Sequence, residues 1–382
     1  MRTFPIEYVR AQFPALSGQG GSKGGRIYLD NPAGTQLPQC VIDAIMYALS
    51  KAASNYGGFF ENSRNADEIK QGAHAAMADM LGTTVPEEII FGPNMTTVTL
   101  HLSRSIGRLF SAGDEIIVTK MDHEGDVSPW LLMAEDHGLV VKWLPFNRET
   151  WRIEPEDLEA LITDRTRFLA LNYASNLTGS INDVTRLVDI AHSSGVITFV
   201  DAVQLAPHVL IDVMKVRADF LVCSSYKFFG PHMGILWGRR ALLDDLTAYK
   251  VRCASNQLPS KFETGTPQTE LLAGITATVD YFADLGGQVG QQRTLDRRVR
   301  ISDAFESARN YETTLVDRLI SGLQSIRGIT IHGITNPNRF GERVPTVAIT
   351  HQSIETSVIA KALAQKDICV WNGHNYAFEV VR

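Results

Sequence analysis

The sequence predicts an α/β protein whose mostly parallel sheet is covered by helices on both faces. Short apolar runs recur over 89–92, 115–119, 168–171 and 196–200, and turn residues end each of them, which is typical of buried strands. Helical patterns alternate with these runs, as expected for parallel strands joined by crossover helices. A length of 382 residues is too great for one small core and suits about two domains.

The composition is that of an ordinary globular protein, with 44% hydrophobic and 20% charged residues. A formal net charge of −6 argues against nucleic acid as the main partner, because phosphate binding needs a basic surface. No apolar run approaches the length of a membrane span, and the first residues lack the apolar core of a signal peptide. The four cysteines are scattered, which predicts free thiols and neither disulfides nor a zinc site. We therefore expect a cytoplasmic protein without a bound metal.

The N-terminal part predicts a short amphipathic helix over 6–16, a strand over 26–29 and a turn over 30–35. The stretch over 18–25 is rich in glycine and could suggest a phosphate-binding loop. Such a loop follows a strand and opens a helix. Because this stretch precedes its strand, an ordinary loop is the better interpretation.

The strand over 89–92 is followed by a polar turn and by a helical pattern that reaches about Phe110. The N-terminus of a helix offers free N–H groups and a positive dipole end to an anion. An ordinary helix cap by Asn94 or Thr96 is the alternative.

The next two strands also lead into polar turns. The strand over 115–119 precedes the stretch Asp122-His123-Glu124-Gly125-Asp126, where His123 taken alone would be a loop or packing residue. The strand over 168–171 precedes a turn that contains Asn176. A helix is predicted over 183–192, with a glycine as its stop.

Two neighbouring strands end on side chains suited to catalysis. One strand ends at Asp201, and the apolar run over 220–223 leads to Lys227. Ligands bind at the carboxyl ends of the strands in an open α/β sheet. A lysine among apolar groups loses affinity for its proton and can act as a nucleophile, although a surface lysine with a packed stem is the alternative. A lysine that forms a Schiff base and an aspartate that holds a pyridinium nitrogen are the pair that pyridoxal phosphate (PLP) requires.

From about Gly286 the chain becomes charged and helix-rich, which predicts a smaller α+β domain. Leu315, Leu319 and Leu323 are spaced for one face of a helix, and Ser353 is a candidate cap for a later helix. We expect a large domain over 18–285 and a small domain formed by 1–17 and 286–382.

The stretch Asp201-x-x-Gln204, followed by Ser224-Ser225-Tyr226-Lys227-Phe228-Phe229-Gly230-Pro231, resembles the fold-type I PLP enzymes of the class V aminotransferase group. Within that group the chain is most similar to the cysteine desulfurase and selenocysteine lyase family, from about Tyr28 to the last residue. The resemblance implies PLP as cofactor and an amino acid as substrate. It also implies a large domain with a mostly parallel sheet of the seven-stranded type and a smaller C-terminal α+β domain.

The resemblance further implies a role for individual residues. Lys227 would bind the cofactor covalently and later move protons at Cα, Asp201 would keep the pyridine nitrogen protonated, and His123 would stack on the ring. The other cofactor-binding residues would be Gln204 and Asn176 at the phenolic oxygen, and Met95, Thr96, Ser224, Tyr226 and Thr266 at the phosphate. Since the family's threonine at the position of Thr266 reaches the neighbouring subunit's phosphate, the match implies a two-fold homodimer with shared active sites.

The pattern of a cysteine desulfurase breaks at its nucleophile. By the match of Gly373-His374, Tyr376 stands where the nucleophilic cysteine would be. A phenol of pKa ~10 cannot replace a thiolate at neutral pH. Cys369 lies seven residues earlier in an apolar run and is predicted to be a small core residue. Trp371 replaces an arginine that relatives carry before Gly-His.

Two further departures concern substrate and phosphate binding. Relatives continue with a strand and an arginine that holds the substrate carboxylate, whereas this sequence stops at Arg382. Either the sequence is incomplete or the carboxylate is held otherwise. Tyr226 stands where classical desulfurases have a phosphate-binding histidine, and a phenol can still donate one hydrogen bond.

We therefore expect a PLP-dependent lyase or transferase that performs C–S lyase or other β-elimination chemistry without a protein persulfide. Desulfuration through a persulfide is the family's default and remains the first alternative. Racemisation, transamination and C–C bond formation stay open on the same scaffold, and a cofactor-free interaction protein is the rival from another class. The sequence names neither the substrate nor a sulfur-accepting partner.

Overall fold

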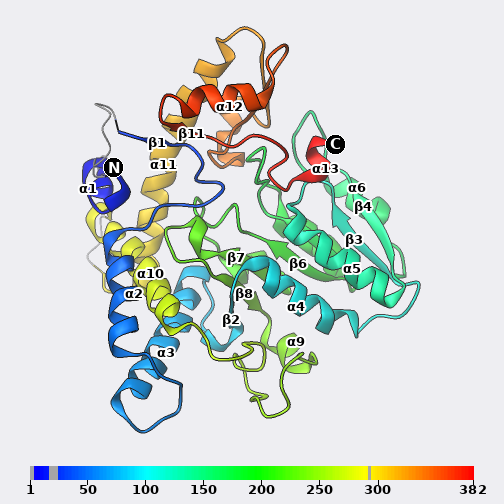
Figure 1. Ribbon diagram of the computed structural model, residues 1–382. Helices are drawn as coiled ribbons and strands as arrows, with labels where there is room; N and C mark the ends of the chain where they lie inside the picture. The colour runs from blue at the N-terminus through cyan, green and yellow to red at the C-terminus, as the bar shows by residue number, and fades with distance from the viewer. Residues whose placement is uncertain (1–3, 17–24, 291–293) are drawn as a thin grey trace.

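The computed structural model describes residues 4–16, 25–290 and 294–382. Its centre is a seven-stranded sheet of order β2-β8-β7-β6-β5-β3-β4 (Figure 1). β8 is antiparallel to both of its neighbours, and the other pairs are parallel, which confirms the mostly parallel α/β sheet. The strands are β2 (Ile89–Gly92), β3 (Glu115–Thr119), β4 (Val140–Leu144), β5 (Thr166–Asn172), β6 (Ile197–Asp201), β7 (Phe220–Ser224) and β8 (Gly234–Gly238).

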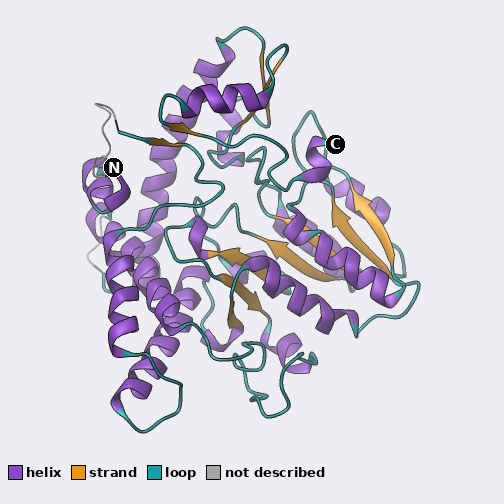
Figure 2. Cartoon of the chain, viewed as in Figure 1, coloured by secondary structure: helices purple, strands orange, loops and turns teal. Residues whose placement is uncertain are grey.

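Helices cover both faces of this sheet (Figure 2). Successive strand residues point to opposite faces, and the buried residues accordingly fall into two apolar clusters. Ile117 and Leu169 belong to the cluster that includes residues of α3 and α7, whereas Ile116 and Phe168 belong to the cluster that includes residues of α4 and α5. The helices of this part of the chain are α2 (Gln39–Lys51), α3 (Glu61–Leu81), α4 (Met95–Gly107), α5 (Ser128–His137), α6 (Pro155–Leu161), α7 (Val184–Ser193), α8 (Val213–Val216), α9 (Arg240–Asp245) and α10 (Thr269–Val289).

The C-terminal part begins with the long helix α11 (Arg297–Gln324), which packs along α10. It continues with β9 (Ile329–His332), the 3-10 helix η5 (Pro337–Glu342), β10 (Ala348–His351), α12 (Thr356–Ala364), β11 (Ile368–Cys369) and α13 (Phe378–Val381). β9 and β10 form an antiparallel pair, and β11 pairs in parallel with β1 (Ile27–Tyr28). α12 and these short strands form a lobe at the top of Figure 1.

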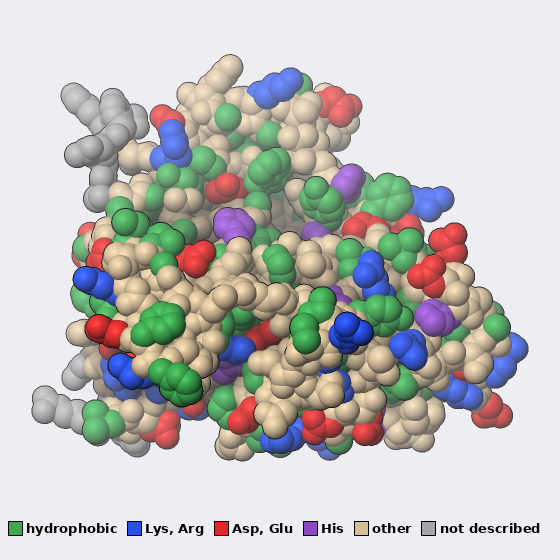
Figure 3. Space-filling view, turned by 60° about the horizontal axis from the view of Figure 1, so that its bottom comes forward, with side chains coloured by type: hydrophobic (Ala, Val, Ile, Leu, Met, Phe, Trp, Pro, Cys, Tyr) green, Lys and Arg blue, Asp and Glu red, His purple; other side chains and the backbone are tan. Residues whose placement is uncertain are grey.

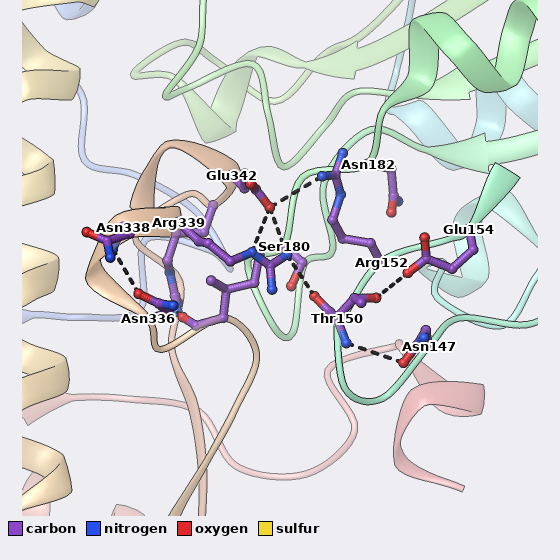
Figure 4. Close-up of polar contacts among 12 residues, drawn as sticks. Asn147, Thr150, Arg152, Glu154, Ser180, Asn182, Asn336, Asn338, Arg339 and Glu342 are labelled. Carbon is purple, nitrogen blue, oxygen red and sulfur yellow. Dashed lines mark hydrogen bonds and ion pairs between the residues drawn. The ribbon is translucent and has the colours of Figure 1, made fainter.

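A network of polar contacts joins this C-terminal part to the body of the protein (Figure 4). The Glu342 carboxylate accepts hydrogen bonds from Arg339 at 2.7 and 3.0 Å and from Arg152 at 3.3 Å. Arg339 also donates to the carbonyl of Thr150 at 3.2 Å. η5 is therefore tied to the loop that precedes α6.

The structure corrects four local predictions. The expected helix over 6–16 is divided into α1 (Ile6–Ala11) and the 3-10 turn η1 (Pro14–Leu16), because a proline cannot continue the hydrogen-bonding pattern. α12 begins at Thr356 after Glu355, so Ser353 is not its cap. The other two corrections concern the exposure of α11 and of Cys369.

The buried stripe of α11 contains Val316 and Ile320, whereas Leu315 and Leu319 are 47% and 38% exposed. Both stripes have helical spacing, and contact with Phe340 decides which of them is buried. Cys369 is half-buried, since a two-residue strand in the small lobe does not reach the core of the protein.

No helix in the described part of the chain combines the length and apolar character that a membrane crossing requires.

Candidate active site

The site lies at the carboxyl edge of two neighbouring parallel strands. Asp201 is the last residue of β6, and Lys227 lies in the 3-10 turn η4 (Ser225–Lys227) that follows β7 directly. β6 and β7 pair in parallel, so both side chains start from the same edge of the sheet. This is the edge at which open α/β sheets bind their ligands.

Lys227 is held by the turn over 30–35, which lies far away in sequence. Its Nζ donates to the carbonyl of Pro32 and lies 4.9 Å from the centre of the Tyr226 ring. The turn is fixed to the lysine's own loop, because the Thr35 N–H donates to the Tyr226 carbonyl at 2.9 Å and the Phe229 N–H donates to the Thr35 hydroxyl at 2.8 Å. Burial lowers the pKa of Lys227 to about 8, against the opposing attraction of Asp201. A useful fraction of this amine is therefore uncharged near neutral pH.

Asp201 is buried and remains a carboxylate at neutral pH. It is 5% exposed, and its Oδ1 accepts a hydrogen bond from the Val203 N–H at 2.7 Å. Burial raises its pKa to about 6, while the Val203 N–H and the Lys227 charge limit the rise. The Asp201 carboxylate can therefore bind a partner that carries a positive charge.

His123 precedes the 3-10 turn η3 (Glu124–Asp126) and is neutral. Its Nδ1 accepts from the Gly125 N–H at 2.9 Å, so the single proton of the ring is on Nε2. Burial, and then the Lys227 charge, lower its pKa to about 4. Its ring centre lies 5.2 Å from that of Tyr376, at an interplanar angle of 31°.

Met95 and Thr96 open α4 beside His123. A Cβ built on Gly125 would lie 3.0 Å from both His123 Nδ1 and Thr96 Oγ1, and 3.2 Å from Met95 Sδ. The missing side chain of Gly125 therefore lets the two turns approach each other. Asn94 is the cap of α4, since its Oδ1 accepts from the Thr97 N–H at 2.8 Å, which confirms the ordinary cap as one role of this turn.

The two predicted amides have different environments. Asn176 donates from Nδ2 to the carbonyl of Asn375 at 2.7 Å, and its buried Oδ1 has no hydrogen-bond partner among the described residues. Gln204 is 4% exposed and donates to the Thr346 hydroxyl at 2.7 Å. Because buried polar atoms are normally paired, the free Oδ1 of Asn176 fits a site built for a polar ligand.

The predicted phosphate residues are only partly brought together. Ser224 is buried at the end of β7, and the Tyr226 ring stacks on His232 with centres 4.8 Å apart and an interplanar angle of 8°. Thr266 is exposed, and its hydroxyl donates to Asn55 Oδ1 at 3.1 Å. A contact of Thr266 with another subunit's site stays a prediction.

Sequence reasoning missed several groups at this edge. Asp122 and Asp126, on either side of His123, are 2% and 0% exposed. The His232 ring, which stacks on Tyr226, was also missed, because it reaches the site from a turn whose sequence is ordinary. The acids flanking His123 were a visible signal, although such residues are common in any turn.

The arrangement combines a partly uncharged lysine, a buried carboxylate, a neutral imidazole and several hydrogen-bonding side chains. Figure 3 shows a hollow between the lobe at the top and the body below, with histidine and apolar side chains around it. The lysine can act as a nucleophile and as a proton carrier. The carboxylate can stabilise a cationic ring nitrogen.

Comparison with known proteins gives the family. The family model "Aminotransferase class-V" matches residues 27–381. A cysteine desulfurase of Yersinia pestis (strain Pestoides F) is 31% identical over 393 aligned positions, which cover 99% of this chain and 90% of that protein. The apo structure of a cysteine desulfurase from Thermococcus onnurineus NA1 superposes with a TM-score of 0.86 at 26% identity, covering 100% of this chain and 90% of the other.

A third similarity concerns the fold alone. The cysteine desulfurase CsdA of Escherichia coli, solved in its S-sulfonic acid form, gives a TM-score of 0.82 at 24% identity and covers 99% of this chain and 90% of the other. The match to the family model, over residues 27–381, includes the sheet, the lysine turn and the C-terminal lobe. This chain therefore belongs to the class V aminotransferase family, a family of PLP-dependent enzymes, and has cysteine desulfurases among its relatives.

Proposed function

We propose that this protein binds PLP, acts on an amino acid, and uses Lys227, Asp201 and His123 as its catalytic residues. The supporting geometry is the placement of Asp201 and Lys227 on neighbouring strand ends. The lowered pKa of Lys227 supports covalent capture of a carbonyl carbon, since only the uncharged amine is a nucleophile. The family membership supports the same cofactor.

The side chains present fit the group. PLP, when bound, supplies an electron sink for bonds broken at the substrate's Cα or Cβ. The Asp201 carboxylate would hold the pyridine nitrogen in its protonated form, and the neutral His123 ring would cover one face. Gln204 and Asn176 would bond the phenolic oxygen, and the phosphate would be held by Met95, Thr96, Ser224, Tyr226 and a second subunit's Thr266.

For the reaction we propose cleavage of a C–S bond, or of a similar bond at Cβ, without a protein persulfide. The observation that carries this choice is that Tyr376 lies beside His123, while residues 370–382 contain no cysteine. Lys227 would remove the proton from the substrate's Cα, and the sulfur would leave Cβ as sulfide together with the bonding electrons. No step in this sequence needs a thiol of the protein.

A cysteine desulfurase in the strict sense is the second candidate, because the relatives carry that name. It would need a cysteine that can reach the substrate sulfur, and Cys369 is the nearest in sequence to Tyr376. Its carbonyl accepts from the Leu29 N–H at 3.0 Å, so the backbone of Cys369 is fixed to the strand that precedes the lysine-holding turn. The other three cysteines lie in other parts of the chain, and all four are free thiols, which supports a reducing, cytoplasmic compartment.

The two candidates differ in their products. Incubation of the PLP-loaded protein with cysteine should give sulfide and pyruvate in equal amounts if the reaction is an elimination, and alanine with enzyme-bound sulfur if it is a desulfuration. We expect pyruvate, no mass gain of one sulfur, and normal turnover in Cys369→Ser. Alanine formation together with a thiol-releasable persulfide on Cys369 would establish the second candidate. A screen of other amino acids by visible absorbance would extend the search for the substrate.

A further inference from the structure

Asp122 and Asp126 are buried carboxyl groups for which the proposed function has no use. Each has one satisfied oxygen: the Thr119 hydroxyl donates to Asp122 Oδ2, and Trp130 Nε1 donates to Asp126 Oδ1 at 3.0 Å. The second oxygens, Asp122 Oδ1 and Asp126 Oδ2, are buried and accept no hydrogen bond from a described residue. Two unsatisfied acceptors of this kind are costly, since buried polar atoms normally find partners.

One proton satisfies both orphaned oxygens. The side chains of Asp122 and Asp126 lie within hydrogen-bonding reach of each other, and a bond between them requires a proton because ionised carboxylates only accept. Burial raises the pKa of both groups well above the ordinary value.

The charged surroundings also favour the protonated form. Asp201, from β6, raises the pKa of both carboxyl groups by repulsion. The neighbours from β3 and α5 are the neutral Thr119 and Trp130. Lys227, from η4, acts on Asp201 and His123. The positive charge of Lys227 therefore acts on Asp201 and His123. The negative charge of Asp201 favours the protonated forms of Asp122 and Asp126.

The two acids lie on either side of His123 in the chain. Asp122 precedes it in sequence, and the Asp126 N–H donates to the His123 carbonyl at 2.8 Å. Trp130, which binds the Asp126 carboxyl, packs against Phe168 and Phe199 with ring centres 4.4 and 4.9 Å apart. The histidine turn is therefore attached to the rigid sheet through the side chain of Asp126.

We propose that Asp122 and Asp126 form an acid pair that shares one proton, and that this pair positions His123 at the candidate active site. The proposal goes beyond the proposed function, because it holds for any reaction at this site and for the protein without cofactor. Asp122 and Asp126 are positioning residues. They act through His123 and touch no substrate.

The first test detects the shared proton by the pH dependence of the protein's stability. Urea unfolding of the apo protein would be followed between pH 5 and 9 for the wild type, Asp126→Asn and the exposed control Asp136→Asn. A folded-state pKa raised above the unfolded one gives stability that is lost as pH rises towards the folded pKa. The unfolding constant of the wild type, relative to Asp126→Asn, should therefore rise with pH by up to about tenfold per pH unit. A pH-independent ratio would show that the pair carries no shared proton.

The second test detects the shared proton by spectroscopy. Infrared difference spectra of the apo protein at neutral pH should contain the band of a buried, protonated carboxyl group. Asp122→Asn and Asp126→Asn should each lose this band, because the amide N–H can donate to the remaining carboxylate and so replaces the shared proton. An absent wild-type band, or a band that persists in either variant, would overturn the proposal.

The third test concerns position. NMR titration of the His123 ring should give a pKa near 4 in the wild type and in Asp126→Asn, whose amide donates to Asp122 permanently. Asp126→Ala should move the His123 pKa towards the ordinary value of about 6.5, as the turn opens to water. An unchanged titration in a folded Asp126→Ala protein would show that the pair does not position His123.

Discussion

Lys227 illustrates how burial prepares one residue for two tasks. Its amine is held by the Pro32 carbonyl while burial lowers its pKa to about 8. The same amine must lose a proton to become a nucleophile and must later exchange protons with the substrate. A pKa near the working pH serves both tasks.

The lowered pKa predicts how PLP loading depends on pH. The rate at which apo protein takes up PLP should rise from pH 6.5 and level off above about pH 8, because the uncharged fraction of Lys227 follows that curve. Stopped-flow absorbance would measure the rate, and borohydride reduction with peptide mapping would place the label. A label on another lysine, or a rate that is flat across this range, would contradict the assignment.

Asp201 should control turnover more than occupancy. Asp201→Asn retains the shape of the side chain and loses the charge, so some PLP should still bind. Turnover should fall by about 10²-fold or more, since a neutral amide cannot stabilise a pyridinium. Absorbance gives the occupancy and product formation gives kcat. Near-normal kcat in a loaded variant would mean that the proposed pairing is wrong.

At the scale of elements, the contact between η5 and the loop before α6 depends on one carboxylate. Glu342 receives both Arg152 and Arg339, and the Arg339 hydrogen bond lowers its pKa. A lowered folded-state pKa gives stability that is present above the unfolded pKa of about 4.3 and is lost as pH falls below it.

Replacing Glu342 should therefore cost stability in a pH-dependent way. Glu342→Gln should destabilise the protein by about 0.5–1 kcal/mol at pH 7, a small value because its side chain is 39% exposed and water screens the pairs. The difference from wild type should shrink below about pH 4. Urea unfolding would measure it, with the exposed Glu149→Gln as control. An equal effect at pH 7 and pH 3.5 would argue against the ion pairs.

Helix α11 offers a test of which apolar stripe holds the C-terminal part in place. Ile320 is 1% exposed and packs with Val316 and Phe340, so Ile320→Ala should cost about 2–4 kcal/mol. Leu319→Ala, one position earlier and 38% exposed, should cost well under half as much. Thermal unfolding would compare the losses of stability in the two variants. Losses of similar size would show that the stripe containing Leu319 is also covered in solution.

At the scale of the whole molecule, four large exposed apolar side chains on α2 and in the connection to α3 support the proposed homodimer. Phe59 and Phe60 are 96% and 61% exposed in the connection between α2 and α3, and Met46 and Tyr47 on α2 are 60% and 58% exposed. Large apolar side chains exposed together on one part of a chain are typical of an interaction site. We propose that a second copy covers them and brings Thr266 to the other subunit's phosphate site.

Sedimentation should therefore find a dimer at micromolar concentration. Phe59→Asp should shift the protein to monomers and weaken PLP binding, because Thr266 would lose its partner site. Leu132→Asp, also at an exposed apolar position but on α5, serves as the control. A fully loaded, active monomer of the wild type would contradict the proposal.

The sequence predicted the sheet and its two reactive strand ends because their signals are local. Apolar runs bounded by turns are visible around Asp201 and Lys227. The pairing of β1 with β11 was not predictable, since two-residue strands carry no pattern and their partner is almost a whole chain away. The Asp122–Asp126 proton was hidden for another reason, because it depends on burial and on the neighbouring Asp201.

The β1–β11 pair has a consequence for the order in which the protein forms during synthesis. β1 leads into the turn that holds Lys227 through Pro32, and its partner β11 is made only after the sheet and the lysine loop. Chains fold from the N-terminus as they emerge from the ribosome, and contacts between distant segments form slowly. We therefore expect the nascent chain to fold its sheet first and to close the lysine turn last, so that a ribosome-bound intermediate has the body of the enzyme before it can hold a cofactor.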